Sequence, residues 1–443
     1  MDPLIIALIV AVFTLITLFS GIPIAFGLSF VSVVLLVSFE GFQMLDVFAE
    51  TFYAGLNSFV LLSIPMFILM GMAVANSPAG KDLYTGLDRW LWRLPGGLVI
   101  SNIGACSIFA ALSGSSPATC AAIGTMGIPE MRQRGYSDQI ATGTIAAGGT
   151  LGVLIPPSIV LIVYGMATGT SIGRLFLCGL IPGFMLAGLF AIWALIHSYF
   201  IDKDSAKALR QRTPPTLKEK LEVLPRVLPF LLIIAGVLYV LYGGVATPSE
   251  ASGVGAFLVF VLIAVVYKIY QPKKIWNIIK VSMKESVMIM FIIAASYFFS
   301  FTLSQLYVTQ SLAQSMIEIS ANKWVIFFLI NIFLLVAGFF LPPVAVIVMT
   351  SAILLPVITT LGFDPYWFAI VFTINMEIGL ITPPVGLNLY IIKGITPDVS
   401  LSKILRGSIP FMFMMVLAII ILCIFPEIVT WLPDKLMGKP LGY

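Results

Sequence analysis

A glycine followed four residues later by two adjacent prolines occurs in strongly apolar sequence at two places that lie a fixed distance apart. In the first copy Gly152 precedes Pro156-Pro157, and in the second Gly379 precedes Pro383-Pro384, at an offset of 383 − 156 = 227 residues. Consecutive prolines interrupt a helix, because each lacks a backbone N–H donor and clashes with the preceding turn. The chain is therefore expected to contain two broken helices at corresponding places.

The surroundings of these breaks are membrane-like. Of the 443 residues, 60% are hydrophobic and only 10% are charged, whereas about one quarter of an ordinary soluble domain is charged. Many apolar stretches reach the roughly 20 residues that a spanning helix needs, which excludes a soluble enzyme with one anchor. The sequence contains nothing that resembles a catalytic constellation, a nucleotide loop or a nucleic-acid surface, so we expect a lipid bilayer around the chain and no nucleic-acid partner.

The offset of 227 residues extends beyond the double prolines. Pro129 matches Pro356 (356 − 129 = 227) and Gly135 matches Gly362 (362 − 135 = 227). Ile181-Pro182 recurs as Ile409-Pro410 at an offset of 228, since 410 − 182 = 228. A unit of hairpin, broken helix and returning helix is therefore predicted to occur twice.

Each predicted hairpin consists of two short apolar arms around a turn. The arms of the first, 98–111 and 118–129, enclose Ser113-Gly114-Ser115-Ser116, and those of the second, 325–338 and 344–361, enclose Pro342-Pro343. An arm of about 14 residues at 1.5 Å per residue spans roughly 21 Å, against a hydrocarbon core of about 30 Å. The pattern predicts re-entrant hairpins, which enter and leave the membrane on one side.

Charge predicts that the two units are inverted. Arg89, Arg132 and Arg134 flank the first hairpin, whereas Lys323 and Asp364 flank the second. The positive-inside rule places the ends of the first hairpin in the cytoplasm and gives the second no such signature. We expect an all-α polytopic membrane protein with inverted repeats, two re-entrant hairpins and two broken transmembrane helices, as in secondary transporters.

The same pattern predicts how the chain is divided. Residues 1–80 would form N-terminal scaffold helices, and residues 81–200 the first repeat. Residues 201–285 would hold a cytoplasmic loop, further scaffold helices and a basic interfacial helix. The second, inverted repeat would occupy 286–432, and 433–443 would be a C-terminal tail.

A broken helix exposes carbonyl groups at one end and N–H groups at the other, which suit a cation and an anion respectively. Oxygen ligands without a compact acidic cluster favour Na⁺ over Ca²⁺ or a transition metal. The residues predicted to hold Na⁺ are Ser113, Gly114, Ser115, Gly149, Gly152 and Pro156 at the first centre, and Gly338, Gly379, Thr382 and Pro383 at the second.

The substrate is expected between the hairpin tips and the breaks. Its predicted contacts are Ser113, Ser115, Ser116, Thr119, Pro157, Pro342, Thr382 and Asn388. Alone, the serine-rich turn is also compatible with an ordinary loop or a small-residue helix contact. Glu377 is a candidate functional acid, with an ion pair or a snorkelled side chain as the alternatives. The sequence has no chain of Asp, Glu and His for a proton relay, which favours sodium coupling.

Several motifs together resemble the large membrane subunit of tripartite ATP-independent periplasmic (TRAP) transporters. The most specific is Gly-Leu-Ile-Thr-Pro-Pro-Val-Gly-Leu-Asn at 379–388. Weaker ones are Ile-Pro-Met-Phe-Ile-Leu-Met-Gly at 64–71, Ser-Gly-Ser-Ser at 113–116, Ile-Pro and Arg-Gly-Tyr within 128–136, and Gly with Ile-Pro-Pro-Ser within 152–158. Many members carry an acid where this chain has Thr119 and Phe340-Leu341, so no acidic ligand is transferred.

The resemblance implies sodium-driven import of an organic acid, such as a C4-dicarboxylate or sialic acid, across the bacterial inner membrane by an elevator mechanism. It also implies a periplasmic substrate-binding protein and a small four-helix membrane subunit, here expected as a separate chain because no four-helix segment precedes Met1. The alternative is a stand-alone ion-coupled carboxylate transporter or exchanger of similar fold. A membrane-embedded enzyme acting on lipid-linked substrates is the remote alternative.

Overall fold

The computed structural model describes residues 3–92, 97–197, 214–318 and 322–439, and these residues form helices joined by turns and loops, without a strand. Within this part of the chain, eight helices are long and apolar enough to cross a membrane, or nine if one bent pair is counted as a single span. The expected all-α polytopic fold is thus confirmed. The boundary predicted at residues 200–201 lies outside the described residues.

The first half runs from α1 to α10. Its helices are α1 (Pro3–Phe19), α2 (Ile24–Glu40), α3 (Asp46–Leu56), α4 (Ser63–Ala75), α5 (Ala79–Leu91), α6 (Gly97–Ser113), α7 (Ser116–Gln133), α8 (Asp138–Leu154), α9 (Ile159–Thr168) and α10 (Ile172–Ile196), with short 3₁₀ turns at Phe42–Leu45 and Phe59–Leu62.

The second half runs from α12 to α21. Its helices are α12 (Leu217–Tyr242), α13 (Pro248–Tyr267), α14 (Pro272–Gln305), α15 (Val308–Glu318), α16 (Lys323–Phe340), α17 (Pro343–Thr360), α18 (Pro365–Leu380), α19 (Leu387–Ile395), α20 (Leu401–Ile424) and α21 (Glu427–Met437).

The repeat extends further than the sequence motifs do. Helices α6 and α16 end at Ser113 and Phe340 (340 − 113 = 227), and α8 and α18 begin at Asp138 and Pro365 (365 − 138 = 227). The same offset relates helices before the hairpins: α2 ends at residue 40 and α13 at 267 (267 − 40 = 227), and α5 ends at 91 and α15 at 318 (318 − 91 = 227). Nearly the whole chain is therefore built from two copies of one helix order.

The copies differ most where α14 replaces α3 and α4. The segments 42–56 and 59–75 meet at a bend of 59°, whereas α14 runs unbroken for 34 residues. The bend lies at Asn57-Ser58, where Asn57 leaves helical backbone conformation (φ −83°, ψ 61°). Lysine and glutamate, which are better helix formers, occupy the corresponding positions 284 and 285, and the helix continues through them.

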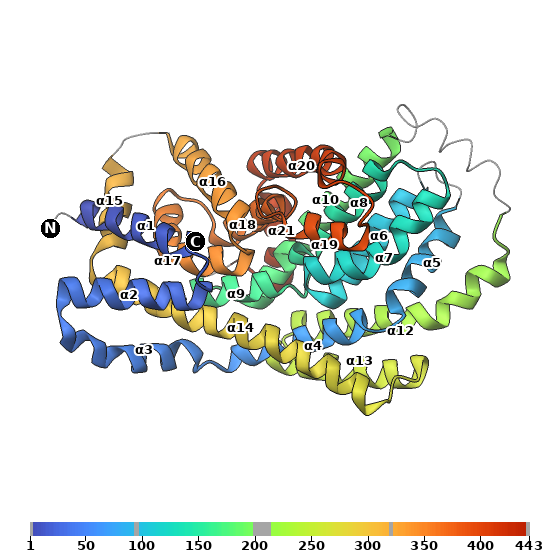
Figure 1. The fold of residues 1–443 in the computed structure, drawn as a ribbon, viewed down its shortest axis with the longest axis horizontal. Helices are drawn as coiled ribbons and strands as arrows, with labels where there is room; N and C mark the ends of the chain where they lie inside the picture. Colours follow the sequence, from blue (N-terminus) through green and yellow to red (C-terminus); the bar gives the residue numbers. More distant parts are fainter. Residues whose placement is uncertain (1–2, 93–96, 198–213, 319–321, 440–443) are drawn as a thin grey trace.

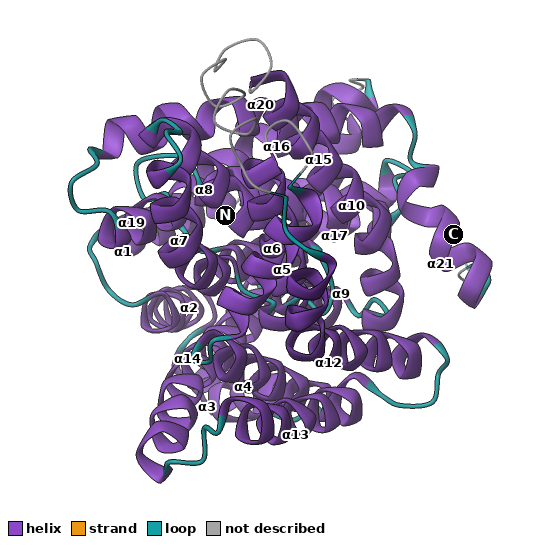
Figure 2. Ribbon diagram, turned by 90° about the vertical axis from the view of Figure 1, so that its right-hand side faces the viewer, coloured by secondary structure: helices purple, strands orange, loops and turns teal. Residues whose placement is uncertain are grey.

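Figure 1 shows α2, α3, α4, α12, α13 and α14 along one side of the molecule, below the hairpins and the broken helices, and Figure 2 shows the same two layers from the end. The two broken helices form the centre of the upper part. Every residue of α18 is buried, as is α8 from Ile140 to Leu154. Helix α8 packs against α6, α7 and α20, α18 packs against α16, α17 and α20, and α8 and α18 also touch each other.

Two sequence-based expectations about single helices were wrong. The apolar stretch 410–431 predicts a single last spanning helix, but α20 ends at Ile424 and a separate helix, α21, follows it. Pro426 accounts for the break, because a proline disfavours helical conformation in the residue before it. The basic segment around 275–279, expected as an interfacial helix of its own, is the first part of the long helix α14.

Three of the four hairpin arms are longer than the sequence indicated, and the fourth, α17, has the expected length. Helices α6 and α7 contain 17 and 18 residues, and α16 and α17 contain 18 each. Both arms of the second hairpin are long and apolar enough to count as membrane spans, so arm length does not support re-entry there. The re-entrant placement stays a prediction.

Candidate functional site

The first helix break separates α8 from α9 at Ile155–Ser158, and the peptide bond between its two prolines is cis. Ser158 satisfies part of the interrupted backbone. Its hydroxyl donates to the carbonyl oxygen of Val153 and accepts from the N–H of Leu161 at 3.3 Å, which caps α9. This local capping explains how an irregular segment is accommodated in a fully buried helix.

The tip of the first hairpin lies directly on this break. A Cβ on Gly152 would be 2.9 Å from the carbonyl carbon of Ser115, and one on Gly114 would be 2.8 Å from the carbonyl oxygen of Pro157. Gly114 also has φ +59°, a conformation that glycine adopts without steric cost. The Ser116 hydroxyl donates to the carbonyl of Thr150 at 3.2 Å. The structure therefore brings the predicted tip and broken helix together.

Oxygen atoms cluster inside this tip. The hydroxyls of Ser113 and Thr119 are 2.9 Å apart, and the Thr119 hydroxyl donates to the carbonyl of Ser115 at 2.9 Å. The Ser113 hydroxyl lies 3.3 Å from the same carbonyl. Two hydroxyls and one carbonyl within hydrogen-bonding reach form a neutral oxygen set of the kind that hard cations accept.

Helix packing alone is enough to account for the glycine at position 149. A side chain there would overlap the sulfur of Cys120, whose thiol donates to the carbonyl of Ile145 at 3.3 Å. Its small size thus allows α7 to approach α8 closely. The ligand roles predicted for Gly149, Gly152 and Pro156 remain predictions.

The second centre repeats the close approach through backbone alone. A Cβ on Gly379 would be 2.7 Å from the carbonyl carbon of Gly338, and the N–H of Val385 donates to the carbonyl of Phe339 at 3.2 Å. The break spans residues 381–386, and its Pro383-Pro384 bond is cis. The Thr382 hydroxyl donates to the carbonyl of Ile378 at 2.6 Å, within its own helix end.

Comparison with known proteins agrees with this architecture. The family model described as "Tripartite ATP-independent periplasmic transporter, DctM component" matches residues 9–428. The C4-dicarboxylate TRAP transporter large permease protein of Vibrio cholerae is 34% identical over 441 residues, covering 95% of this chain and 96% of that protein. A sialic acid TRAP large permease of the same organism is 30% identical, covering 95% and 97%. The chain belongs to this family.

A solved structure supports the fold alone. The YdaH transporter of Alcanivorax borkumensis, described as having an unusual topology, superposes with a TM-score of 0.63 at 13% identity, covering 96% of this chain and 99% of that one. This TRAP large permease is a multi-pass inner-membrane protein and, like its relatives, a transporter component rather than an enzyme. Large permeases of this family work with a substrate-binding protein and a small membrane subunit.

Asn388 of the TRAP permease links its two repeats. The side-chain amide donates to the carbonyl of Ala146 on α8 at 3.1 Å, and its oxygen, Oδ1, is buried without a hydrogen-bond partner in the described part of the chain. A second amide, Asn375 of α18, donates to Asn331 of α16. Asn388 thus lies where α19 crosses the first broken helix, and Pro342 is the N-cap of α17 at the second hairpin tip.

Glu377 is fully buried in α18, and neither carboxylate oxygen has a hydrogen-bond partner among the residues that the structure describes. It forms no ion pair with a described residue and does not extend to an exposed position, so neither structural alternative is observed. An unpaired buried carboxylate costs several kcal/mol, which keeps Glu377 a functional candidate. Its repeat counterpart, at 377 − 227 = 150, is Thr150, whose carbonyl accepts from the first hairpin tip.

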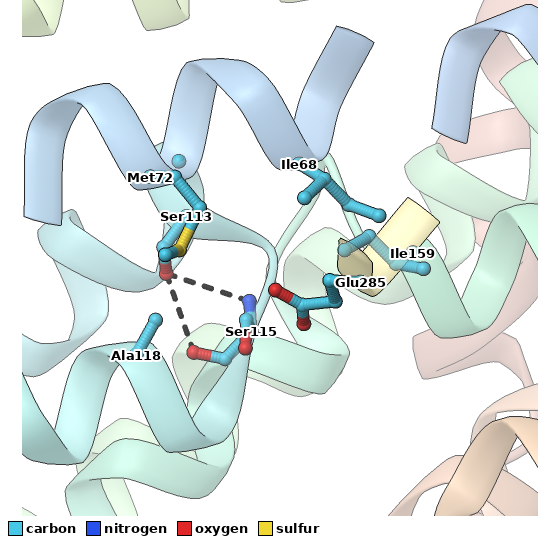
Figure 3. A pocket seen from close by; sticks show the side chains of 8 residues that line it. Ile68, Met72, Ser113, Ser115, Ala118, Ile159 and Glu285 are labelled. Atoms are coloured by element: carbon cyan, nitrogen blue, oxygen red, sulfur yellow. Dashed lines mark hydrogen bonds between the residues drawn. The ribbon is translucent and has the colours of Figure 1, made fainter. Parts of the chain in front are cut away.

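One acid near the first centre was missed by the sequence reasoning. Glu285 of α14 lines a small cavity together with Ser113 and Ser115 (Figure 3). In the sequence it follows Lys280 and Lys284, which the positive-inside rule assigns to a cytoplasmic flank, so nothing there marks it as a site residue. Helical periodicity indicates that Glu285 lies beside the inward face of α14. The buried positions of this helix include Ile278, Ser282, Ser286 and Ile289, and residue 285 borders that stripe.

Proposed function

We propose that this TRAP large permease imports a small organic acid across the bacterial inner membrane, driven by Na⁺. The relatives that support an organic acid are named for C4-dicarboxylate, sialic acid and isethionate transport, at 34%, 30% and 32% identity. A further relative is named for ectoine, at 29% identity. Because the relative named for C4-dicarboxylate is 34% identical along nearly its whole length, a C4-dicarboxylate is the first substrate to test.

The observation that carries the proposal is the pairing of each hairpin tip with a helix break. Both tips also begin a long helix whose first turn has no side-chain cap: Ser115 before α7 and Pro342 before α17. The positive end of the helix dipole favours an anion at both helix starts, although Pro342 and Pro343 themselves carry no N–H group. We assign the substrate carboxylates to these helix starts and Na⁺ to the oxygen cluster of Ser113, Ser115 and Thr119.

The two layers of the fold suggest the moving parts. In the proposed elevator mechanism, the lower layer of α2–α4 and α12–α14 forms the fixed scaffold together with α1, and the hairpins with the broken helices move against it. The small four-helix membrane subunit would extend the scaffold, and a periplasmic protein would deliver the substrate. One relative, from Oleidesulfovibrio alaskensis, is named a DctMQ permease, and this chain covers 63% of its length.

The site assignment is tested by uptake into proteoliposomes that hold the permease, its small subunit and the binding protein. Ser115→Leu fills the space between tip and break, and we expect it to abolish Na⁺-dependent uptake. Thr125→Leu, at an exposed position of the same helix, is the matched control and should leave uptake unchanged. Full uptake by the Ser115 variant would contradict the assignment, and uptake without the binding protein would support a stand-alone transporter instead.

A further inference from the structure

A small cavity separates the first hairpin tip from two helices of the lower layer, α4 and α14 (Figure 3). Its polar lining consists of Ser113, Ser115 and Glu285, and its apolar walls include Ile68 of α4 and Ile159 of α9. It encloses about 180 Å³ of empty volume, part of which opens outward, and leaves room for about one water-sized particle. The cavity fits an ion and is too small for an organic acid.

Glu285 has no counter-charge in this cavity. Its carboxylate is turned toward Ser115 in Figure 3, and it forms no hydrogen bond or ion pair with any residue that the structure describes. The neighbouring Lys284 is exposed. Helix α4 brings no titratable side chain to the cavity, and neither do the tip and α9. A half-buried carboxylate among apolar side chains is unfavourable unless a cation or a proton neutralises it.

The tip supplies neutral oxygens beside this carboxylate. The Ser115 hydroxyl forms no hydrogen bond with a described residue, and the Ser113 hydroxyl, held at 2.9 Å from Thr119, retains a free lone pair. Within the described residues, no three His, Cys, Asp or Glu side chains gather into a metal-binding group. One carboxylate with hydroxyl ligands suits a hard monovalent cation better than a transition metal.

We propose that this cavity binds one Na⁺ ion, with the Glu285 carboxylate and the hydroxyls of Ser113 and Ser115 as ligands. The ion neutralises the carboxylate, and water completes its coordination. The site adjoins the first hairpin–break centre and shares Ser113 and Ser115 with it, but it differs from that centre because its carboxylate ligand comes from α14, in the opposite layer. The proposal depends on the proposed transport function in one respect only, namely that one of these two layers is fixed and the other moves.

The ligands come together only while the hairpin tip is docked on α4. Gly71 of α4 permits this contact, because a Cβ there would be 2.7 Å from the Cα of Ser113. Movement of the hairpin along the scaffold would separate the serines from Glu285 and release the ion. Na⁺ in this cavity would therefore stabilise the docked arrangement over any other.

The test is the number of Na⁺ ions bound by the full chain in lipid nanodiscs, measured with radioactive Na⁺ at saturation and fixed pH. We expect Glu285→Gln to bind one ion fewer than the wild type and Glu285→Asp to bind the same number more weakly. Glu50→Gln, at an exposed acid of α3, is the matched control and should leave the number unchanged. An unchanged number in Glu285→Gln would overturn the proposal, as would loss of a bound proton instead of Na⁺.

A second variant tests assembly across the two layers and leaves the carboxylate in place. Gly71→Val displaces the tip from α4, and we expect it also to bind one ion fewer. Retention of all ions by this variant would show that Glu285 does not share its ion with the tip. If the wild type showed no Na⁺-driven uptake while Glu285→Gln still lost one ion, the proposed function would fail and the cavity site would stand.

Discussion

The two hairpin–break centres share one backbone frame and differ in chemistry. At the first, the tip is Ser-Gly-Ser-Ser, and side-chain hydroxyls bond to each other and to the broken helix. At the second, the tip is Phe340-Leu341-Pro342-Pro343, and the contact is a single backbone hydrogen bond from Val385 to Phe339 plus two glycines in close approach. The duplicated frame thus fixes the geometry, while the side chains give the two centres different ligand sets.

The ends of the two hairpins differ as well. The first is held by ion pairs: Arg132 contacts Asp138 at 3.0 Å and Asp398 at 2.5 Å, and Arg134 contacts Asp88 at 3.3 Å. At the second, Lys323 and Asp364 form no ion pair with a described residue, and Asp364 instead caps α18. The charge difference that predicted opposite orientations therefore corresponds to a difference in how each hairpin is anchored.

The largest expected effect comes from the shared frame. Gly152→Ala and Gly379→Ala each place a methyl group 2.9 Å or less from hairpin backbone, which no rotamer can relieve. We expect both to abolish uptake and to lower stability by about 1–3 kcal/mol, measured by thermal unfolding in detergent. Gly253→Ala in α13, with nothing within 4 Å of the new methyl group, is the control. Normal transport by either of the first two variants would show that the frame is not needed.

The next effect concerns the link between the two centres. Asn388→Ala removes the hydrogen bond from α19 to the buried carbonyl of Ala146, which keeps only the longer contact with the Cys120 thiol from outside its own helix, so we expect a loss of about 0.5–1.5 kcal/mol in stability. Asn76→Ala removes a similar bond, from Asn76 to Met72 at 2.8 Å, at an exposed helix end, and should cost much less. Equal unfolding temperatures for the two variants would mean that the link contributes nothing.

A smaller effect is expected from the side-chain ligands that distinguish the first centre from the second. Thr119→Val keeps the shape of the side chain and removes one hydroxyl of the first centre, which is worth about 0.5–1.5 kcal/mol. We expect the Na⁺ concentration for half-maximal uptake to rise up to about tenfold. The repeat counterpart, at 119 + 227 = 346, is Val346, and Val346→Thr should leave that concentration unchanged. Equal effects of the two variants would remove the distinction between the centres.

The smallest effect is expected at the anchor of the first hairpin. A hydrogen bond from Arg132 is the main cause that lowers the pKa of Asp398 below its ordinary value. The stabilisation is therefore present above the ordinary pKa of about 3.9 and disappears as the pH falls through the lowered pKa. Asp398→Asn should unfold at a slightly lower temperature than wild type at pH 7, with the difference shrinking in acid and in high salt. A difference that grows in acid would contradict this assignment.

The sequence was sufficient to predict where the helices break and where the hairpins turn, because prolines and glycines have steric consequences that depend little on tertiary context. Pro156-Pro157 and Pro383-Pro384 end their helices as predicted. The earlier part of the repeat, from α1 to α5, carries no such markers. Its equivalence to α12–α15 follows only from the helix ends in the structure, which share the offset of 227 residues.

Tertiary contacts decided what the sequence left open. The small size of Gly149 is explained by Cys120, on another helix. Glu377 could equally have been paired or snorkelled, and only its complete burial distinguished these cases. Glu285 follows lysines that are typical of a polar segment, yet α14 turns its carboxylate toward the hairpin tip.

The most direct test of the account is uptake of a radiolabelled C4-dicarboxylate into proteoliposomes with the complete transporter under imposed ion gradients. With Na⁺ outside and equal pH on both sides, we predict accumulation above the external concentration, and none when K⁺ replaces Na⁺. Accumulation that follows a pH gradient and ignores Na⁺ would contradict the proposal that the two hairpin–break centres couple sodium to import.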